Sequence, residues 1–82
     1  MKFMVECVLK AGLKSQAMQA FEQRGPNRSP GVTYRGAWVG LHSDVVFVLV
    51  ESAEESLVSA DARSWSQIDD YRITPVIDLE HF

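Results

Sequence analysis

The chain has 82 residues, of which 46% are hydrophobic and 23% are charged, and these proportions are typical of a globular protein. We expect a single domain over residues 1–82, and a domain of this size buries only roughly 60 to 65% of the surface that its unfolded chain exposes. The formal charge of −3 and the scattered Lys and Arg residues exclude nucleic acid as the main ligand, because neutralising phosphates requires a clustered basic face.

The first predicted element is a strand over Lys2–Leu9, where a wholly apolar face alternates with a mixed face at a period of two residues. A helix follows over about Lys14–Arg24, because apolar residues recur there at helical spacing, and Gly25-Pro26 ends it. Residues 25–31 contain two prolines, which predicts an exposed loop.

Two strands joined by a turn follow the loop. The first covers Val32–Val39, and the turn covers Gly40–Asp44. The second is the run Val45–Val50, whose six residues are all apolar and mostly β-branched. Such a run predicts a strand that is apolar on both of its faces.

The second predicted helix begins at Ser52, because Ser52 and Glu55 have the spacing of a capping box, and it runs to about Trp65. The last strand covers Asp70–Ile77, and Pro75 favours an edge position because proline removes a hydrogen-bond donor of the sheet. The order β-α-β-β-α-β is that of a ferredoxin-like α+β fold. We therefore predict a four-stranded antiparallel sheet of order 4-1-3-2 with two helices on one face.

Helices on one face leave the other face of this sheet open. The apolar run over residues 45–50 predicts an apolar patch there, and a second copy of the chain is its simplest cover, so we expect a homodimer. The alternative is a monomer with a moderately apolar open face. The residues predicted to form the dimer face are Met4, Val8, Val46, Val48, Val50 and Val76; the alternate residues of the run 45–50 are the other possibility for this strand.

Glu6 shares the open face with Arg72 if the last strand pairs beside the first. We interpret the two residues as a cross-strand ion pair. In the alternative interpretation, a closed dimer raises the pKa of the Glu6 carboxyl, which then acts as a general base.

Asp61 falls within the apolar stripe of the second helix, one turn from both Leu57 and Trp65, where an ionised group costs free energy unless it is paired or hydrated. In one interpretation it lines a pocket between helix and sheet; in the other the helix is rotated and Asp61 lies at the rim. Two tryptophans favour a pocket for a flat apolar ligand, although aromatic residues at such spacings also form cores. The candidate pocket residues are Trp38, Asp61, Trp65, Glu6 and Arg72.

No catalytic residue, metal or cofactor is assigned. His42 and His81 have no ligand partner at helical or strand spacing. The single cysteine, Cys7, excludes an internal disulfide and alternates with apolar residues, which predicts a core thiol. The glycine-rich spacings of phosphate-binding loops do not occur. No run approaches the roughly 18 apolar residues of a membrane span, and the N-terminal stretch is too short for a signal peptide, so we expect a cytoplasmic protein.

Four segments carry a likeness to known sequences: the opening Met1–Met4, the Pro30–Val32 entry to the second strand, Gly36–Trp38, and the block from Trp65 to Val76. Through them the chain resembles, over nearly its whole length, a family of small bacterial proteins of unknown function in the dimeric α+β barrel superfamily. The resemblance implies a homodimer and no particular activity. Val39 stands where members often carry a histidine, which disfavours histidine-centred chemistry.

Two functions follow as hypotheses. The first is a non-catalytic dimeric module that binds a small metabolite or a protein partner. The alternative is a small cofactor-independent enzyme, because the superfamily that the chain resembles includes monooxygenases and isomerases with clefts between sheet and helices.

Overall fold

The structure is a computed structural model of the chain, and it describes residues 1–24 and 29–82. The predicted helix end at Gly25-Pro26 lies outside these residues. The elements in chain order are β1 (Lys2–Leu9), α1 (Lys14–Arg24), β2 (Thr33–Val39), β3 (Val45–Glu51), α2 (Glu55–Arg63), β4 (Ile68–Val76) and a short 3-10 helix (Leu79–His81).

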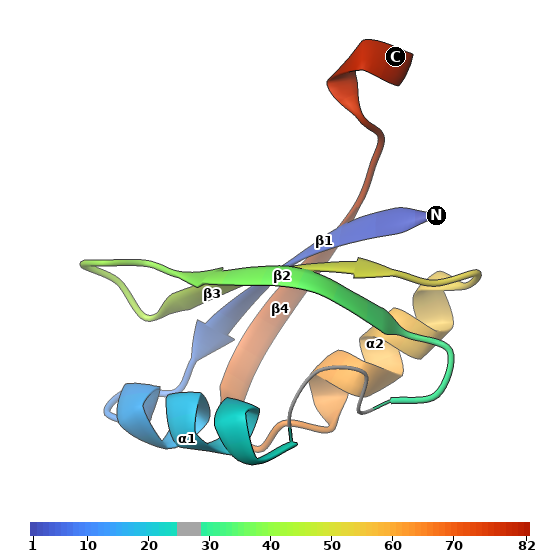
Figure 1. Cartoon of the computed structure of the whole chain (residues 1–82). Helices are drawn as coiled ribbons and strands as arrows, with labels where there is room; N and C mark the ends of the chain where they lie inside the picture. Colours follow the sequence, from blue (N-terminus) through green and yellow to red (C-terminus); the bar gives the residue numbers. More distant parts are fainter. Residues whose placement is uncertain (25–28) are drawn as a thin grey trace.

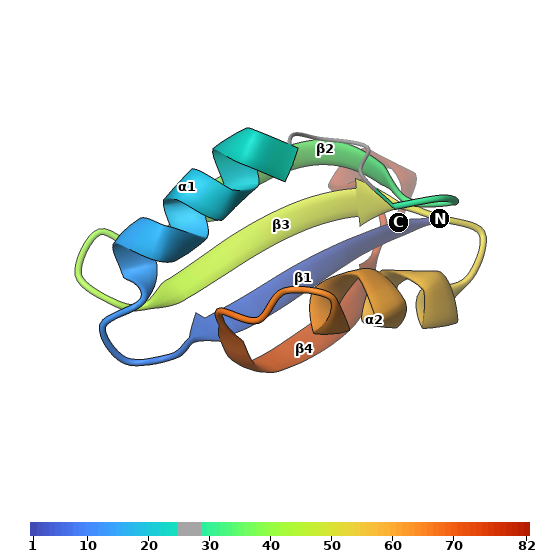
Figure 2. The same cartoon turned by 90° about the horizontal axis from the view of Figure 1, so that it is seen from below.

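The four strands form one antiparallel sheet in the order β2-β3-β1-β4. This order confirms the predicted arrangement 4-1-3-2 and the predicted edge position of β4. Both helices lie on the same side of the sheet, α1 toward β2 and β3 and α2 toward β1 and β4 (Figures 1 and 2). The fold is therefore the ferredoxin-like α+β fold that the element order predicts.

The core lies between the sheet and the helices. On β1 it takes every second residue, including the buried Phe3 and Cys7, which confirms the predicted alternation and the core position of the thiol. Around them the described core contains Val5, Val32, Val48, Val50, Val58 and Ala62.

The predicted assignment of β3 to the two faces was wrong. Antiparallel pairing places Val46, Val48 and Val50 opposite the core residues of β1, so these three valines face the helices and not the open face. Their neighbours Phe47 and Leu49 take the open face instead. The error has a physical cause, because a strand that is apolar at every position carries no period-two signal to show which residues point inward.

The predicted capping box of α2 was also wrong. The helix begins at Glu55 after the N-cap residue Glu54, and no side chain caps it. The hydroxyl of Ser52 instead accepts a hydrogen bond from the backbone N–H of Glu54 at 3.3 Å, and it lies 3.1 Å from the Glu54 carbonyl oxygen. Ser52 therefore shapes the turn before the helix and not its first turn.

The loop into β2 passes close to α2 at Gly31. This residue has a φ of +78°, and a Cβ at its position would lie 2.7 Å from Leu57 Cδ1. Both the backbone conformation and the lack of space favour glycine. Leu57 lies at the edge of the core, with 37% of its surface exposed.

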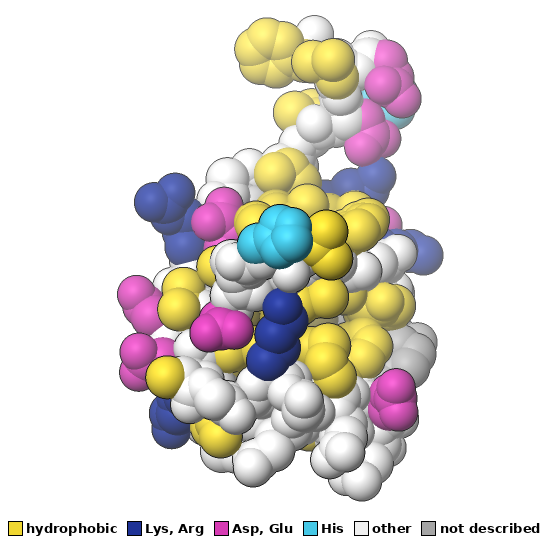
Figure 3. Space-filling view, turned by 90° about the vertical axis from the view of Figure 1, so that its left-hand side faces the viewer, with side chains coloured by type: hydrophobic (Ala, Val, Ile, Leu, Met, Phe, Trp, Pro, Cys, Tyr) yellow, Lys and Arg dark blue, Asp and Glu magenta, His cyan; other side chains and the backbone are white. Residues whose placement is uncertain are grey.

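The chain leaves the sheet after β4 on the side opposite the helices. Figure 1 shows this C-terminal arm, Ile77–Phe82, rising from the open face of the sheet and ending in the 3-10 helix. Hydrophobic side chains gather on the arm at the top of Figure 3, away from the body of the domain. The arm thus extends the domain on the one side that no helix covers.

Candidate functional site

A cavity of about 60 Å³ lies between the two helices and the sheet. Its walls are apolar and aromatic, and among the described lining residues Asp61 is the one with a charged side chain. The sulfur-containing, aromatic and small side chains of the wall come from β1, α1, α2 and the turn after α2. They include Cys7, Ala17, Met18, Phe21, Ala62 and Trp65.

Asp61 lies on α2, and its residue surface is 9% exposed. The Ser29 hydroxyl donates a hydrogen bond to its carboxylate. The Asp61 backbone carbonyl accepts from the N–H of Ser64 at 3.1 Å and from the Ser64 hydroxyl at 2.6 Å. The buried carboxylate therefore connects the segment before β2 to α2 while it forms part of the cavity wall.

Aromatic rings close one end of the cavity. Phe21 stacks near Trp65 with 6.4 Å between ring centroids, and it lies 5.5 Å from the ring of Tyr34. The guanidinium carbon of Arg24 lies 4.1 Å from the Trp65 ring centroid, and Arg24 donates a hydrogen bond to the hydroxyl of Ser64 at 3.1 Å. These contacts connect the end of α1 to the end of α2.

The structure does not bring the five candidate pocket residues together. Asp61 and Trp65 line the cavity, whereas Trp38, Glu6 and Arg72 belong to the open face on the other side of the sheet. Trp38 is 55% exposed, and its ring lies over Gly36. The sheet therefore separates the two tryptophans that the sequence suggested as walls of one pocket.

Glu6 and Arg72 occupy directly opposite positions on β1 and β4, as the predicted sheet order requires. The ion pairs found within residues 1–24 and 29–82 do not include one between these two side chains. The predicted neighbourhood is therefore correct, while the predicted ion pair is absent from the described residues.

The open face has an apolar centre and also carries charged side chains, among them Glu6 and Arg72. Met4, Phe47 and Leu49 are half-buried at its centre, while Val8 and Trp38 are 43% and 55% exposed at one end. Val76 lies at the other end, opposite Lys2. Of the predicted dimer-face residues, Met4, Val8 and Val76 thus lie on this face.

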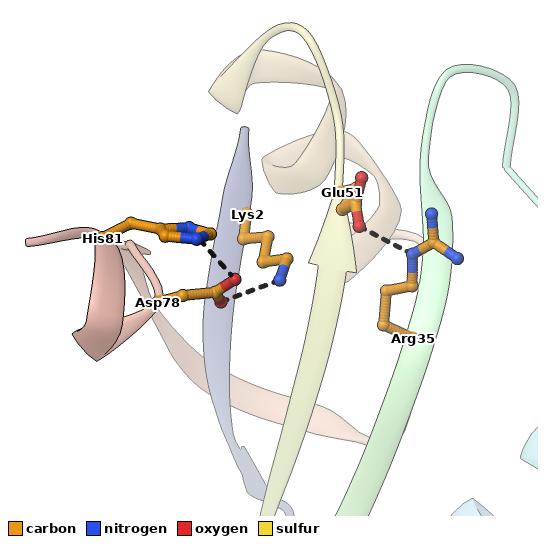
Figure 4. A network of polar contacts seen from close by, with 5 residues as sticks. All are labelled: Lys2, Arg35, Glu51, Asp78 and His81. Carbon is orange, nitrogen blue, oxygen red and sulfur yellow. Dashed lines mark hydrogen bonds and ion pairs between the residues drawn. The ribbon is translucent and has the colours of Figure 1, made fainter.

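Charged residues cluster where the arm leaves the sheet (Figure 4). Lys2 pairs with Asp78 at 2.9 Å, and His81 Nδ1 lies 3.7 Å from the other oxygen of the same carboxylate. Arg35, which forms a bulge in β2, pairs with Glu51 at 2.7 Å. The hydrogen bond to Asp78 raises the pKa of Lys2, and the hydrogen bond from Arg35 lowers the pKa of Glu51.

Sequence reasoning missed this cluster. The pairing of β1 with β4 is the information that would have revealed it. Val76 is opposite Lys2, and Asp78 follows Val76 by two residues, close enough to reach the Lys2 side chain. The cluster borders an open groove of about 430 Å³ between the arm and the end of the sheet, lined by residues that include Met1, Glu51, Ile77 and His81.

Within the described ranges, no group of three or more His, Cys, Asp or Glu side chains is arranged to hold a metal ion. Neither helix of that part of the chain has the length and hydropathy of a membrane span.

No curated protein and no solved structure matches the sequence. One family model does match, over residues 1–82, and it describes a domain of unknown function, DUF3303. The chain therefore belongs to the DUF3303 family.

Proposed function

We propose that the protein is a non-catalytic homodimeric module that binds a small, flat, apolar molecule in the cavity between its helices and its sheet. The observation that carries this proposal is the cavity itself, which is bordered by aromatic rings at one end and by the buried carboxylate of Asp61. Concave, mainly apolar sites with a few polar groups are the usual form of small-molecule sites.

The ligand enlarges the cavity when it binds. A cavity of roughly 150 Å³ accepts benzene, so the 60 Å³ present here is too small for an aromatic ring without movement of the wall. The wall from α1 is suited to such movement, because Ala17 is the one buried residue of that helix and Met18 is a flexible side chain. Phe21, which is only half-buried, can turn with it.

Titration with benzene and with indole, followed by heteronuclear NMR, tests the cavity. Binding should give saturable shifts at Ala17 and Ala62, and the variant Ala17→Leu, which fills the cavity, should abolish them while circular dichroism shows an intact fold. Leu41→Ser, in the exposed turn between β2 and β3, is the matched control and should leave them unchanged. Shifts that do not saturate, or that survive Ala17→Leu, contradict the proposal. Chemical conversion of the bound molecule would favour the enzymatic alternative.

The second part of the proposal is the dimer, in which the open faces of two copies cover each other. It is supported by the apolar centre of that face at Met4, Phe47 and Leu49 and by the exposed Trp38 and Val8 beside it. Burying this surface adds apolar area to a domain whose own core is small.

Light scattering tests the dimer. The wild-type chain should show twice its 9.2 kDa mass at micromolar concentration, and Leu49→Lys should reduce this to the monomer mass. Ala60→Lys places the same charge on the exposed side of α2 and should leave the dimer intact. A wild-type monomer, or equal behaviour of the two lysine variants, would rule out pairing through the open face.

A further inference from the structure

The C-terminal arm, Ile77–Phe82, exposes three large apolar side chains in the part of the chain that the structure describes. Ile77, Leu79 and Phe82 are 62%, 85% and 98% exposed. Three large apolar residues with this exposure within six positions form a surface that soluble domains normally cover. Figure 1 shows the arm directed away from the helices, on the side of the open face.

The base of the arm is fixed while its tip is not buried. The Lys2–Asp78 ion pair ties the arm to β1, and the N–H groups of His81 and Phe82 bond back to Asp78 and Leu79 to form one tight turn. Leu79 and Phe82 are exposed on this turn. The arm therefore has a defined direction rather than lying along its own sheet.

The size of the open face bears on what a second copy could bury there. Four strands of 7 to 9 residues, about 4.8 Å apart and rising about 3.3 Å per residue, cover roughly 490 Å² in projection. Each partner in a standard protein interface buries about 800 Å². The open face therefore offers a contact of modest size, and the exposed apolar side chains of the arm would add to the surface buried between two copies.

We propose that the arm of each copy packs against the open face of the second copy, so that Leu79 and Phe82 complete the dimer interface from the partner chain. This inference rests on the proposed dimer and goes beyond it, because it assigns the exposed arm to the partner. A two-fold axis makes the contact reciprocal, so two arms enclose the paired sheets. Binding of a different protein by the arm is the competing outcome.

The first experiment compares dimer dissociation constants by analytical ultracentrifugation. The double variant Leu79→Ser/Phe82→Ser should raise the dissociation constant tenfold or more. Leu41→Ser is the matched control, because Leu41 is as exposed as Leu79, at 84%, but lies in the turn between β2 and β3; it should change the constant less than twofold. Equal effects of the two variants overturn the inference while the dimer itself stands, and a wild-type monomer overturns both proposals.

The second experiment traps the contact between chains. The variants Val8→Cys and Thr33→Cys place a cysteine at one end or the other of the open face. A tagged chain with either substitution is mixed with Leu79→Cys, and a short bismaleimide is added as the cross-linker. The native thiol of Cys7 is buried and does not compete. Mixed cross-linked dimers should form with at least one open-face variant and not with Ala60→Cys, whose thiol lies on the helix side. Equal cross-linking to all three variants would contradict the inference.

Discussion

Ser29 donates a hydrogen bond to the carboxylate of Asp61, although the two residues are 32 positions apart in the chain. The bond holds the segment that leads into β2 against α2, at the wall of the cavity. A buried carboxyl group requires such partners, because its transfer from water without a compensating hydrogen bond costs free energy.

We predict that Asp61→Leu destabilises the protein by about 1 to 3 kcal/mol, even though leucine is the more hydrophobic residue, because the Ser29 hydroxyl loses its acceptor. Ser29→Ala should cost a similar amount, since it removes a donor from a buried charge. Urea denaturation measures both. The exposed Ser66→Ala serves as the control and should stay within about 0.5 kcal/mol of the wild type. An unchanged or higher stability of Asp61→Leu would show that the hydrogen bond has no structural role.

The cation–π contact between Arg24 and Trp65 leads to a second prediction. Arg24→Ala should destabilise the protein by about 0.5 to 1 kcal/mol, because it removes both this contact and the hydrogen bond to Ser64. Gln23→Ala, at the neighbouring exposed position, provides the comparison. Thermal unfolding should distinguish the two variants, and equal melting temperatures would mean that the end of α1 contributes nothing to the fold.

Two glycines with the same backbone conformation allow a third prediction. Gly12 and Gly31 both have a φ of +78°, but a Cβ on Gly12 would contact nothing within 4 Å, whereas one on Gly31 would meet Leu57. Both alanine variants should lose about 1 kcal/mol from backbone strain. Gly31→Ala should lose more, and Leu57→Ala should recover part of the additional loss in the double variant. Equal destabilisation at the two positions would show that Leu57 moves aside freely.

The fourth prediction concerns pH. The Arg35 hydrogen bond lowers the pKa of Glu51, so the ionised form of Glu51 stabilises the folded state. This contribution is fully present above the unfolded pKa of about 4.3 and is lost as the pH falls through the lower folded pKa. Arg35→Gln should return the pKa of Glu51 toward its ordinary value and reduce the dependence of stability on pH in that acidic range. A carbon-13 NMR titration of the Glu51 carboxyl measures the shift, and an unchanged pKa in the variant would exclude Arg35 as its cause.

The parts of the fold that follow from periodicity were predictable. Alternation in β1 separates core from open face. The apolar stripe of α2 alone left open whether Asp61 is buried or lies at the rim. The uniformly apolar β3 gives no such information, because its orientation depends on the register with β1, which is a property of the assembled sheet. For this reason Val48 was predicted on the open face but lies on the core side, and its neighbour Leu49 lies on the open face.

The polar contacts of the site were not predictable in the same way. Ser29 bonds Asp61, and Lys2 bonds Asp78 across 76 positions, because the folded chain brings distant segments together. Neither pair has a local spacing that a sequence pattern reveals. Glu6 and Arg72 were placed correctly by the predicted strand order, because they are opposite each other on adjacent strands. The ion pairs of the described residues do not include one between them.

The positions of the two tryptophans provide separate optical probes of the two sides of the sheet. Trp65 is 9% exposed at the cavity, whereas Trp38 is 55% exposed on the open face. In Trp38→Phe, the emission of Trp65 should resist quenching by acrylamide and report the state of the helices. In Trp65→Phe, the emission of Trp38 should shift to shorter wavelength when a second molecule covers it. One fluorescence spectrometer can therefore follow assembly and unfolding as distinct events in this small domain.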